Sequence, residues 1–164
     1  MARVRLVSRP DWIVPILISV ALGVALPGCG GGSSKQVSAA ELVQKADAAC
    51  RAERSSFDRI QAHPPPNASV AAAQTGELVS ATEKANSQLR ALEPPDQLRS
   101  AYARYLDARD HVVNEMKRGQ EAAENQDTRA YGAAQAGVAR DASQRQKLAQ
   151  SLGFKVCSMS PATA

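Results

Sequence analysis

The sequence predicts an all-α protein: an antiparallel up-down-up-down four-helix bundle that follows a cleaved signal peptide. Apolar residues recur every three or four positions, which is the helical period. Proline, Gly and capping residues divide the chain into four long segments, and alanine, the best helix former, is its commonest residue. Helices of about 24–30 residues with short links favour this topology. A three-helix or swapped arrangement is the alternative.

The first helix is expected to begin at a capping box, with Ser38 as cap and Glu41 three residues later. Its apolar stripe is broken at Glu53, and the prolines at 64–66 end it. The stripe comprises Val43, Ala46, Cys50, Phe57 and Ile60.

The second helix is expected from about Ser69 to Leu92, where Glu93-Pro94-Pro95 stops it. One face carries its apolar residues, which are Leu78, Ala81, Ala85, Leu89 and Leu92.

Asp96 is expected to cap the third helix, which reaches about Asn125, and Asp127 is expected to cap the fourth. Gly153 is a good terminator for the fourth helix, and an apolar contact is expected just after it, at Phe154. Both helices carry apolar stripes: Leu98, Tyr102, Tyr105 or Leu106, Val112 or Val113 and Met116 in the third, and Tyr131, Ala134, Val138, Ala142, Leu148 and Leu152 in the fourth.

The start of the chain resembles a bacterial lipoprotein signal. Three arginines precede an apolar segment at 13–26, which as a helix would span only about 21 Å and so is too short for a permanent membrane span. Leu26, Gly28 and Cys29 match the lipobox, whereas Pro27 departs from its usual Ala, Ser or Thr. The resemblance implies cleavage before Cys29 and lipid on its sulfur. An ordinary cleaved signal, or an uncleaved anchor with Cys29 incidental, is the alternative.

The domain organisation follows from this signal. Residues 1–28 form the signal peptide, 29–37 the lipidated cysteine and a Gly/Ser-rich tether, 38–157 the bundle and 158–164 a flexible tail. Loss of three arginines and one aspartate with the signal lowers the net charge from +4 to +2. So small a charge gives no argument for nucleic-acid binding.

Cys50 and Cys157 remain once Cys29 is assigned to lipid. The start of the first helix and the end of the fourth share one pole of an up-down-up-down bundle, so these two cysteines are expected to form a disulfide in an oxidising compartment. Buried free thiols or metal ligands are the alternatives.

Three short segments also carry a resemblance. Residues 47–50 (DAAC), 92–95 (LEPP) and 152–157 (LGFKVC) resemble small, Ala-rich lipoproteins and secreted proteins of actinobacteria. The resemblance implies an exported helical domain with paired cysteines, and it carries over no catalytic residue.

Tyr102, Tyr105 and Arg109 share roughly one side of the third helix and are the candidate lining of a ligand groove, since Tyr and Arg often anchor interfaces. The alternative is that they cover the core with their polar tips in water. We predict no metal, because His63 and His111 lack the spacing of a metal site. We predict no catalytic residues and no cofactor, because no Gly-x-Ser-x-Gly motif is present and no glycine loop follows a strand to hold phosphates.

These features together predict a lipid-anchored protein on the extracytoplasmic face of the cell membrane. We expect it to be a non-enzymatic interaction or accessory protein with a partner in the cell envelope. The alternative is a small-ligand-binding lipoprotein that uses the bundle interior or the groove lined by Tyr102, Tyr105 and Arg109.

Overall fold

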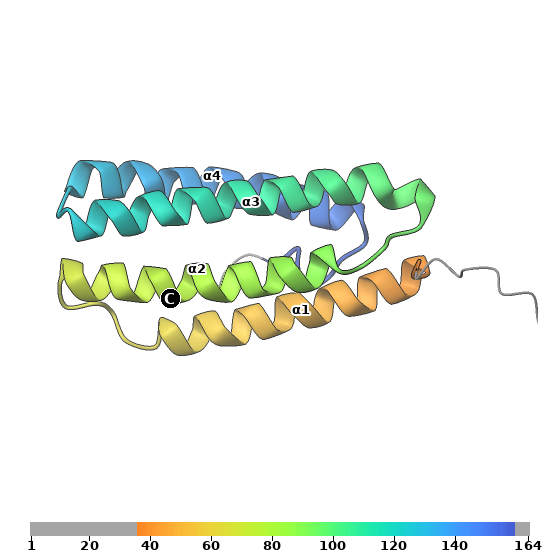
Figure 1. The fold of residues 1–164 in the computed structure, drawn as a ribbon, viewed down its shortest axis with the longest axis horizontal. Helices are drawn as coiled ribbons and strands as arrows, with labels where there is room; N and C mark the ends of the chain where they lie inside the picture. The colour runs from red at the N-terminus through yellow and green to blue at the C-terminus, as the bar shows by residue number, and fades with distance from the viewer. Residues whose placement is uncertain (1–35, 160–164) are drawn as a thin grey trace, which may run out of the picture. The chain divides into compact units, whose positions relative to one another are not determined.

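The computed structural model describes residues 36–159, most of which lie in four helices. Successive helices run antiparallel around a common core, which confirms the predicted four-helix bundle (Figure 1). Within residues 36–159 there is no strand, only an isolated bridge between Gln36 and Glu93. The helices are α1 (Ala39–Ile60), α2 (Ala68–Arg90), α3 (Asp96–Glu124) and α4 (Thr128–Ser151).

The predicted caps of α1 and α4 are confirmed. The backbone N–H of Ser38 donates to Glu41 Oε2 at 2.9 Å, and the N–H of Glu41 donates to Ser38 Oγ at 3.2 Å. Asp127 Oδ1 accepts from the N–H of Ala130 at 2.9 Å. Each side chain thereby satisfies a backbone donor that the first helical turn leaves free.

The starts of α2 and α3 differ from the prediction. Asn67 caps α2 and accepts from the N–H of Val70 at 3.0 Å, so the helix begins before the expected Ser69. Pro95 occupies the cap position of α3 without a side-chain hydrogen bond. The predicted cap at Asp96 is therefore wrong: Asp96 is the first helical residue, and its carboxylate pairs with Arg99 instead.

Gly153 ends α4 as predicted. Its φ of 78° is in the left-handed region, where glycine carries no Cβ penalty. The N–H of Gly153 donates to Gln150 and that of Phe154 to Ala149, both at 3.0 Å, which is the Schellman pattern. The turn directs the Phe154 side chain into the core, where it is 2% exposed.

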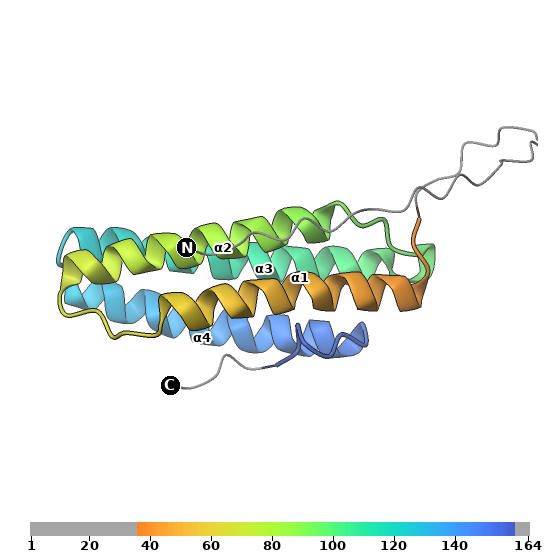
Figure 2. The same cartoon turned by 90° about the horizontal axis from the view of Figure 1, so that it is seen from below.

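The helices pack unequally around the bundle. The backbones of α3 and α4 are the closest, because small residues face each other: a Cβ on Gly119 would lie 3.5 Å from the Cβ of Ala134. The backbones of α1 and α4 do not pack closely against each other. The α1–α4 seam is covered at one end by the turns that follow α4 (Figure 2).

Two apolar clusters fill the interior. The first lies near the start of α1 and includes Leu42, Leu89, Tyr105 and Phe154. The second lies farther along the helices and consists of Val79, Val112, Val113 and Met116. The buried face of α2 is rotated by about one residue from the expected one, because Thr82 and Asn86 are buried in place of Ala81.

The N-terminal end of the described chain is fixed to the loop between α2 and α3. The N–H of Val37 donates to Glu93 O at 2.9 Å, and Gln36 Nε2 donates to Pro94 O at 3.1 Å. The segment expected to be a tether up to residue 37 thus contacts the bundle from residue 36. Residues 1–28, the expected signal, lie outside the described residues. None of the helices between residues 36 and 159 is long and apolar enough to span a membrane.

Candidate functional site

Four polar side chains, one from each helix, form a layer across the bundle, which we call the polar layer. Its members are Glu53 of α1, Asn86 of α2, Arg109 of α3 and Arg145 of α4. The first apolar cluster lies on one side of the layer and the second on the other. The layer is therefore a polar section between the two apolar clusters.

Arg109 is the centre of the polar layer. Its side chain is 1% exposed, and its Nη2 donates to Glu53 Oε2 at 2.8 Å. Its Nε donates to Asn86 Oδ1, and its Nη1 donates to the Tyr105 hydroxyl at 3.3 Å. The same Nη1 lies 3.8 Å from Cys50 Sγ. All three guanidinium nitrogens are thus used inside the bundle, as a buried charge requires.

Asn86 connects the buried layer to the surface. Its Nδ2 lies 3.4 Å from Asp110 Oδ1, and the Asp110 carboxylate pairs with Arg90. Asp110 and Arg90 are each nearly half exposed. Solvent therefore reaches the outer members of this network on the α2–α3 side.

Arg145 is the fourth member of the layer and the least satisfied. It interacts electrostatically with Arg109, Glu53 and Tyr105. Its side chain is only partly buried, yet its Nε is fully covered and has no hydrogen-bond partner in the described part of the chain. A buried donor without a partner costs about 1–3 kcal/mol.

The two arginines of the layer have opposite pKa shifts. Burial disfavours the charge of Arg109, but the Glu53 carboxylate and the Tyr105 hydroxyl outweigh it and raise the pKa of Arg109. Burial also disfavours the charge of Arg145, and the neighbouring Arg109 adds to this effect, so the pKa of Arg145 is lowered. Glu53 thus pairs mainly with Arg109, and Arg145 has no ion pair within residues 36–159.

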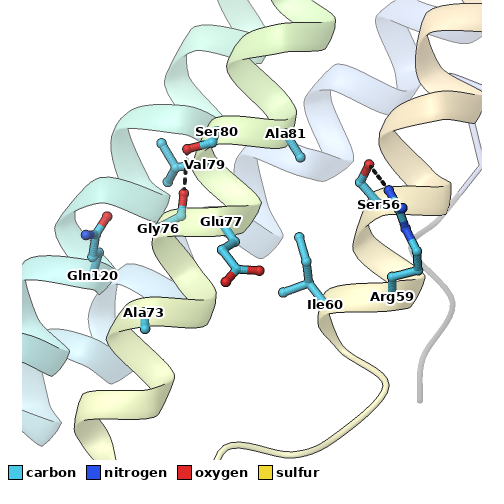
Figure 3. A pocket seen from close by; sticks show the side chains of 10 residues that line it. All are labelled: Ser56, Arg59, Ile60, Ala73, Gly76, Glu77, Val79, Ser80, Ala81 and Gln120. Carbon is cyan, nitrogen blue, oxygen red and sulfur yellow. Dashed lines mark hydrogen bonds between the residues drawn. The ribbon is translucent and has the colours of Figure 1, made fainter.

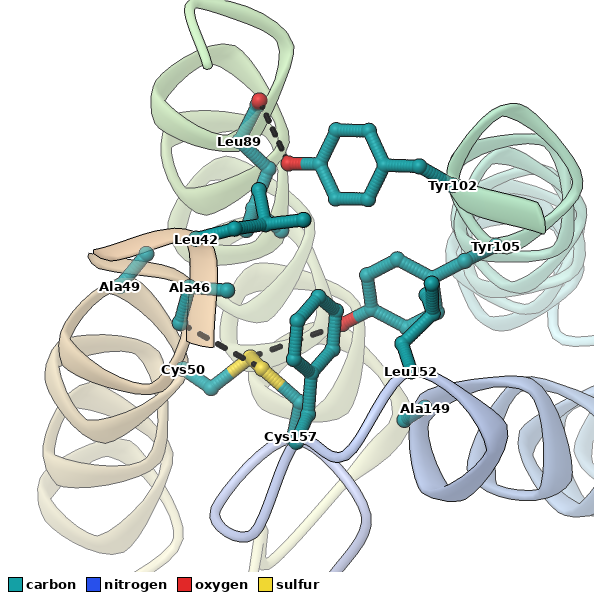
Figure 4. Close-up of a cluster of buried hydrophobic side chains, with 11 residues drawn as sticks. Leu42, Ala46, Ala49, Cys50, Leu89, Tyr102, Tyr105, Ala149, Leu152 and Cys157 are labelled. Atoms are coloured by element: carbon teal, nitrogen blue, oxygen red, sulfur yellow. Dashed lines mark hydrogen bonds between the residues drawn. A yellow bond between two sulfur atoms is a disulfide. The ribbon is translucent and has the colours of Figure 1, made fainter. Parts of the chain in front are cut away.

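The disulfide predicted between Cys50 and Cys157 is present, with an S–S distance of 2.09 Å (Figure 4). Both cysteines are buried. The turn that carries Cys157 is also held by Asp47, whose carboxylate accepts the backbone N–H groups of Lys155, Val156 and Cys157 at 2.8–3.2 Å. A carboxylate and a disulfide therefore fix the end of the chain to α1.

Tyr102, Tyr105 and Arg109 do not line an open groove, contrary to the candidate site predicted from the sequence. All three are at most 2% exposed. The Tyr102 hydroxyl donates to Leu89 O at 2.7 Å (Figure 4). The Tyr105 ring packs edge-on against Phe154, with 5.3 Å between the ring centroids. The alternative, that these side chains cover the core, is closer to the structure, although their polar tips are buried instead of lying in water. Phe154, in the turn after α4, packs against both tyrosine rings.

The remaining predicted site residue, Cys29, lies outside the described residues. Sequence reasoning missed Glu53, Asn86 and Arg145 as interior residues. A signal for two of them was present: Glu53 and Arg145 each occupy a position at which the apolar stripe of their helix is interrupted. A charge at such a position indicates a buried partner on another helix, although it does not say which one.

Two open depressions lie outside the polar layer. The larger, of about 840 Å³, lies between α1 and α2, where Arg59, Ile60 and Glu77 border it together with Gln120 of α3 (Figure 3). The smaller, of about 670 Å³, lies between α3 and α4 near their connecting loop. Arg59 donates to Ser56 within the first depression, so its charge is directed along α1.

No group of three or more His, Cys, Asp or Glu side chains within residues 36–159 is arranged to hold a metal ion. Comparisons with protein-family models, with curated proteins and with solved structures gave no match.

Proposed function

We propose that this chain is a lipoprotein of the extracytoplasmic face of the cell membrane, where its helical bundle acts as a non-enzymatic interaction or accessory module. The observation that carries the proposal is the Cys50–Cys157 disulfide. Disulfides persist in oxidising compartments outside the cytoplasm. The pairing also leaves Cys29, in the lipobox-like run Leu26-Pro27-Gly28-Cys29, as the cysteine available for lipid.

The way the chain joins the bundle supports this proposal. Gln36 and Val37 are fixed at the pole that holds the α2–α3 loop, only seven residues after Cys29. Seven residues of any chain reach at most about 25 Å. A lipid on Cys29 would therefore hold this pole close to the membrane surface.

The opposite pole would then be presented away from the membrane. It is formed by the α1–α2 loop, with its three prolines, and by the α3–α4 loop. Since α3 has 29 residues, this pole would lie about 44 Å beyond the first. We propose that the partner is an envelope protein that contacts this distal half.

The buried ionisable side chains support a binding role over catalysis. Asp47 holds three backbone donors, and Glu53 and Arg109 neutralise each other. Groups committed to such internal partners act on the stability of the bundle, whereas a general acid or base must reach its substrate.

The anchor can be tested by metabolic labelling with a radioactive fatty acid in a bacterial host. We expect label and membrane retention in the unaltered chain and in the Cys50→Ala/Cys157→Ala variant, and loss of both in Cys29→Ser. The double variant is the matched control, because it also removes cysteines but leaves the lipobox intact. Unchanged labelling of Cys29→Ser would contradict the proposal.

The partner can be tested by site-directed photocrosslinking in intact cells. A crosslinker at Asn125, in the distal loop, should yield a discrete adduct, whereas one at Arg99, near the other pole, should not. Equal adducts at both positions, or none at either, would count against a distal interaction surface.

A further inference from the structure

The polar layer carries more positive than negative charge. Its two guanidinium groups, on Arg109 and Arg145, are opposed by the single carboxylate of Glu53. Asp110 lies beyond Asn86 on the α2–α3 side and is paired with Arg90, so it does not offset the excess. A net charge of +1 inside a bundle is costly unless a counter-ion approaches it.

Arg145 is the member of the layer that such a counter-ion could reach. Arg109 is fully enclosed, whereas the side chain of Arg145 is partly exposed. Arg145 projects from α4, whose backbone does not pack closely against α1. Its covered Nε has no hydrogen-bond partner within the described residues, so one donor of the guanidinium is unused.

We propose that the α1–α4 seam binds a carboxylate group at the level of the polar layer, with Arg145 as its main contact. An edge of a guanidinium with two N–H donors matches the two oxygens of a carboxylate, and the resulting pair is bidentate. A monoanion balances the charge of +1, while a dianionic phosphate would exceed it and would be repelled by Glu53. This site goes beyond the proposed function and does not depend on the lipid anchor.

The carboxylate has two chemical sources, a small carboxylic acid or the free carboxy terminus of a peptide. Acetate and N-acetylalanine are probes for the two sources. Acetamide and N-acetylalaninamide are their neutral counterparts with almost the same shape. Only the two acids can form the charge-assisted pair with Arg145.

The experiment is a titration of the full ¹⁵N-labelled chain in zwitterionic detergent, followed by NMR through the arginine Nε–Hε signals. The Arg145 signal is assigned by its loss in Arg145→Gln. Arg140→Gln is the matched control, because Arg140 lies on the same helix but is 72% exposed. At constant ionic strength we expect a saturable shift of the Arg145 signal with acetate and none with acetamide.

The peptide arm identifies the source. If the Arg145 shift saturates at a lower concentration of N-acetylalanine than of acetate, the ligand is the carboxy terminus of a peptide. If acetate saturates the shift at the lower concentration, the ligand is a small carboxylic acid. A shift of Arg145 that stays linear, that acetamide reproduces, or that is no larger than the shift of Arg140 would overturn the proposal. A second readout is thermal: acetate should raise the melting temperature of the unaltered chain and of Arg140→Gln more than that of Arg145→Gln.

Discussion

Removal of the Cys50–Cys157 disulfide should destabilise the bundle by about 5 kcal/mol. The bond closes a loop with a sequence separation of 107 residues. In the chain-entropy model such a loop removes about 16 cal/mol/K from the unfolded state, which is about 4.8 kcal/mol at 25 °C. This is a large fraction of the 5–15 kcal/mol by which proteins are typically stable.

The same loss of free energy can be expressed as a change in melting temperature. Residues 36–159 should unfold with an entropy of roughly 260 cal/mol/K, so a loss of 4.8 kcal/mol lowers the melting temperature by about 18 °C. Circular dichroism at 222 nm follows the loss of helix, and guanidinium titration gives the free energy of unfolding directly.

The variant is Cys50→Ala/Cys157→Ala, with Cys29→Ala as the control that removes a cysteine outside the bundle. The oxidised and reduced unaltered protein provide a second comparison, in which no side chain is deleted. A loss below about 1 kcal/mol in both comparisons would refute the reasoning, because the expected effect of the crosslink on the entropy of the unfolded chain would then be absent.

Three further predictions concern single side chains. Glu53→Gln should lower the free energy of unfolding by about 3–5 kcal/mol in a guanidinium titration, because it leaves the buried charge of Arg109 without its counter-ion; a loss below 1 kcal/mol would contradict this. Burial raises the pKa of Tyr102. The stability that its neutral hydroxyl contributes is therefore complete below pH 10, the ordinary pKa of tyrosine, and declines at higher pH. Absorbance at 295 nm should show a late ionisation that Tyr102→Phe removes. Gly132→Ala should stabilise α4 by about 0.5–1 kcal/mol, since nothing lies within 4 Å of the added Cβ. Gly153→Ala should destabilise the bundle, because residue 153 has a positive φ. Equal melting temperatures for these two variants would contradict the prediction.

The fold was predictable because its signals are local. Ser38, Asp127 and Gly153 act within one turn of their own helix, and the structure confirms all three. The pairing of Cys50 with Cys157 required only the helix count and direction, which set the pole at which each cysteine lies. The starts of α2 and α3 were harder to predict. Asn67 and Ser69 are both good caps, and Asp96 follows Pro95, which takes the cap position of α3 although it has no capping side chain.

The candidate site was not predictable in the same way, because it depends on how the helices are aligned lengthwise. Glu53 and Arg109 are 56 residues apart in the sequence and meet only when α1 and α3 take one particular alignment. A stripe pattern shows which face of each helix is buried. It does not show which residues of different helices lie at the same height along the bundle. The sequence therefore left open whether Tyr102 and Arg109 line a groove or cover the core, and the structure buries both.

The polar layer also bears on why this sequence adopts one alignment. Much of the interior of the bundle is alanine, including Ala46, Ala49, Ala134 and Ala149. If one helix slipped by one turn along its neighbours, one alanine would often take the place of another. Such a slip costs little apolar burial. It would, however, separate Glu53 from Arg109 and leave both charges buried and unpaired, at a cost of about 3–5 kcal/mol. Since buried polar groups can specify helix register at some expense in stability, we infer that the layer helps to fix the lengthwise alignment of α1 and α3, beside the disulfide that holds the end of the chain to α1.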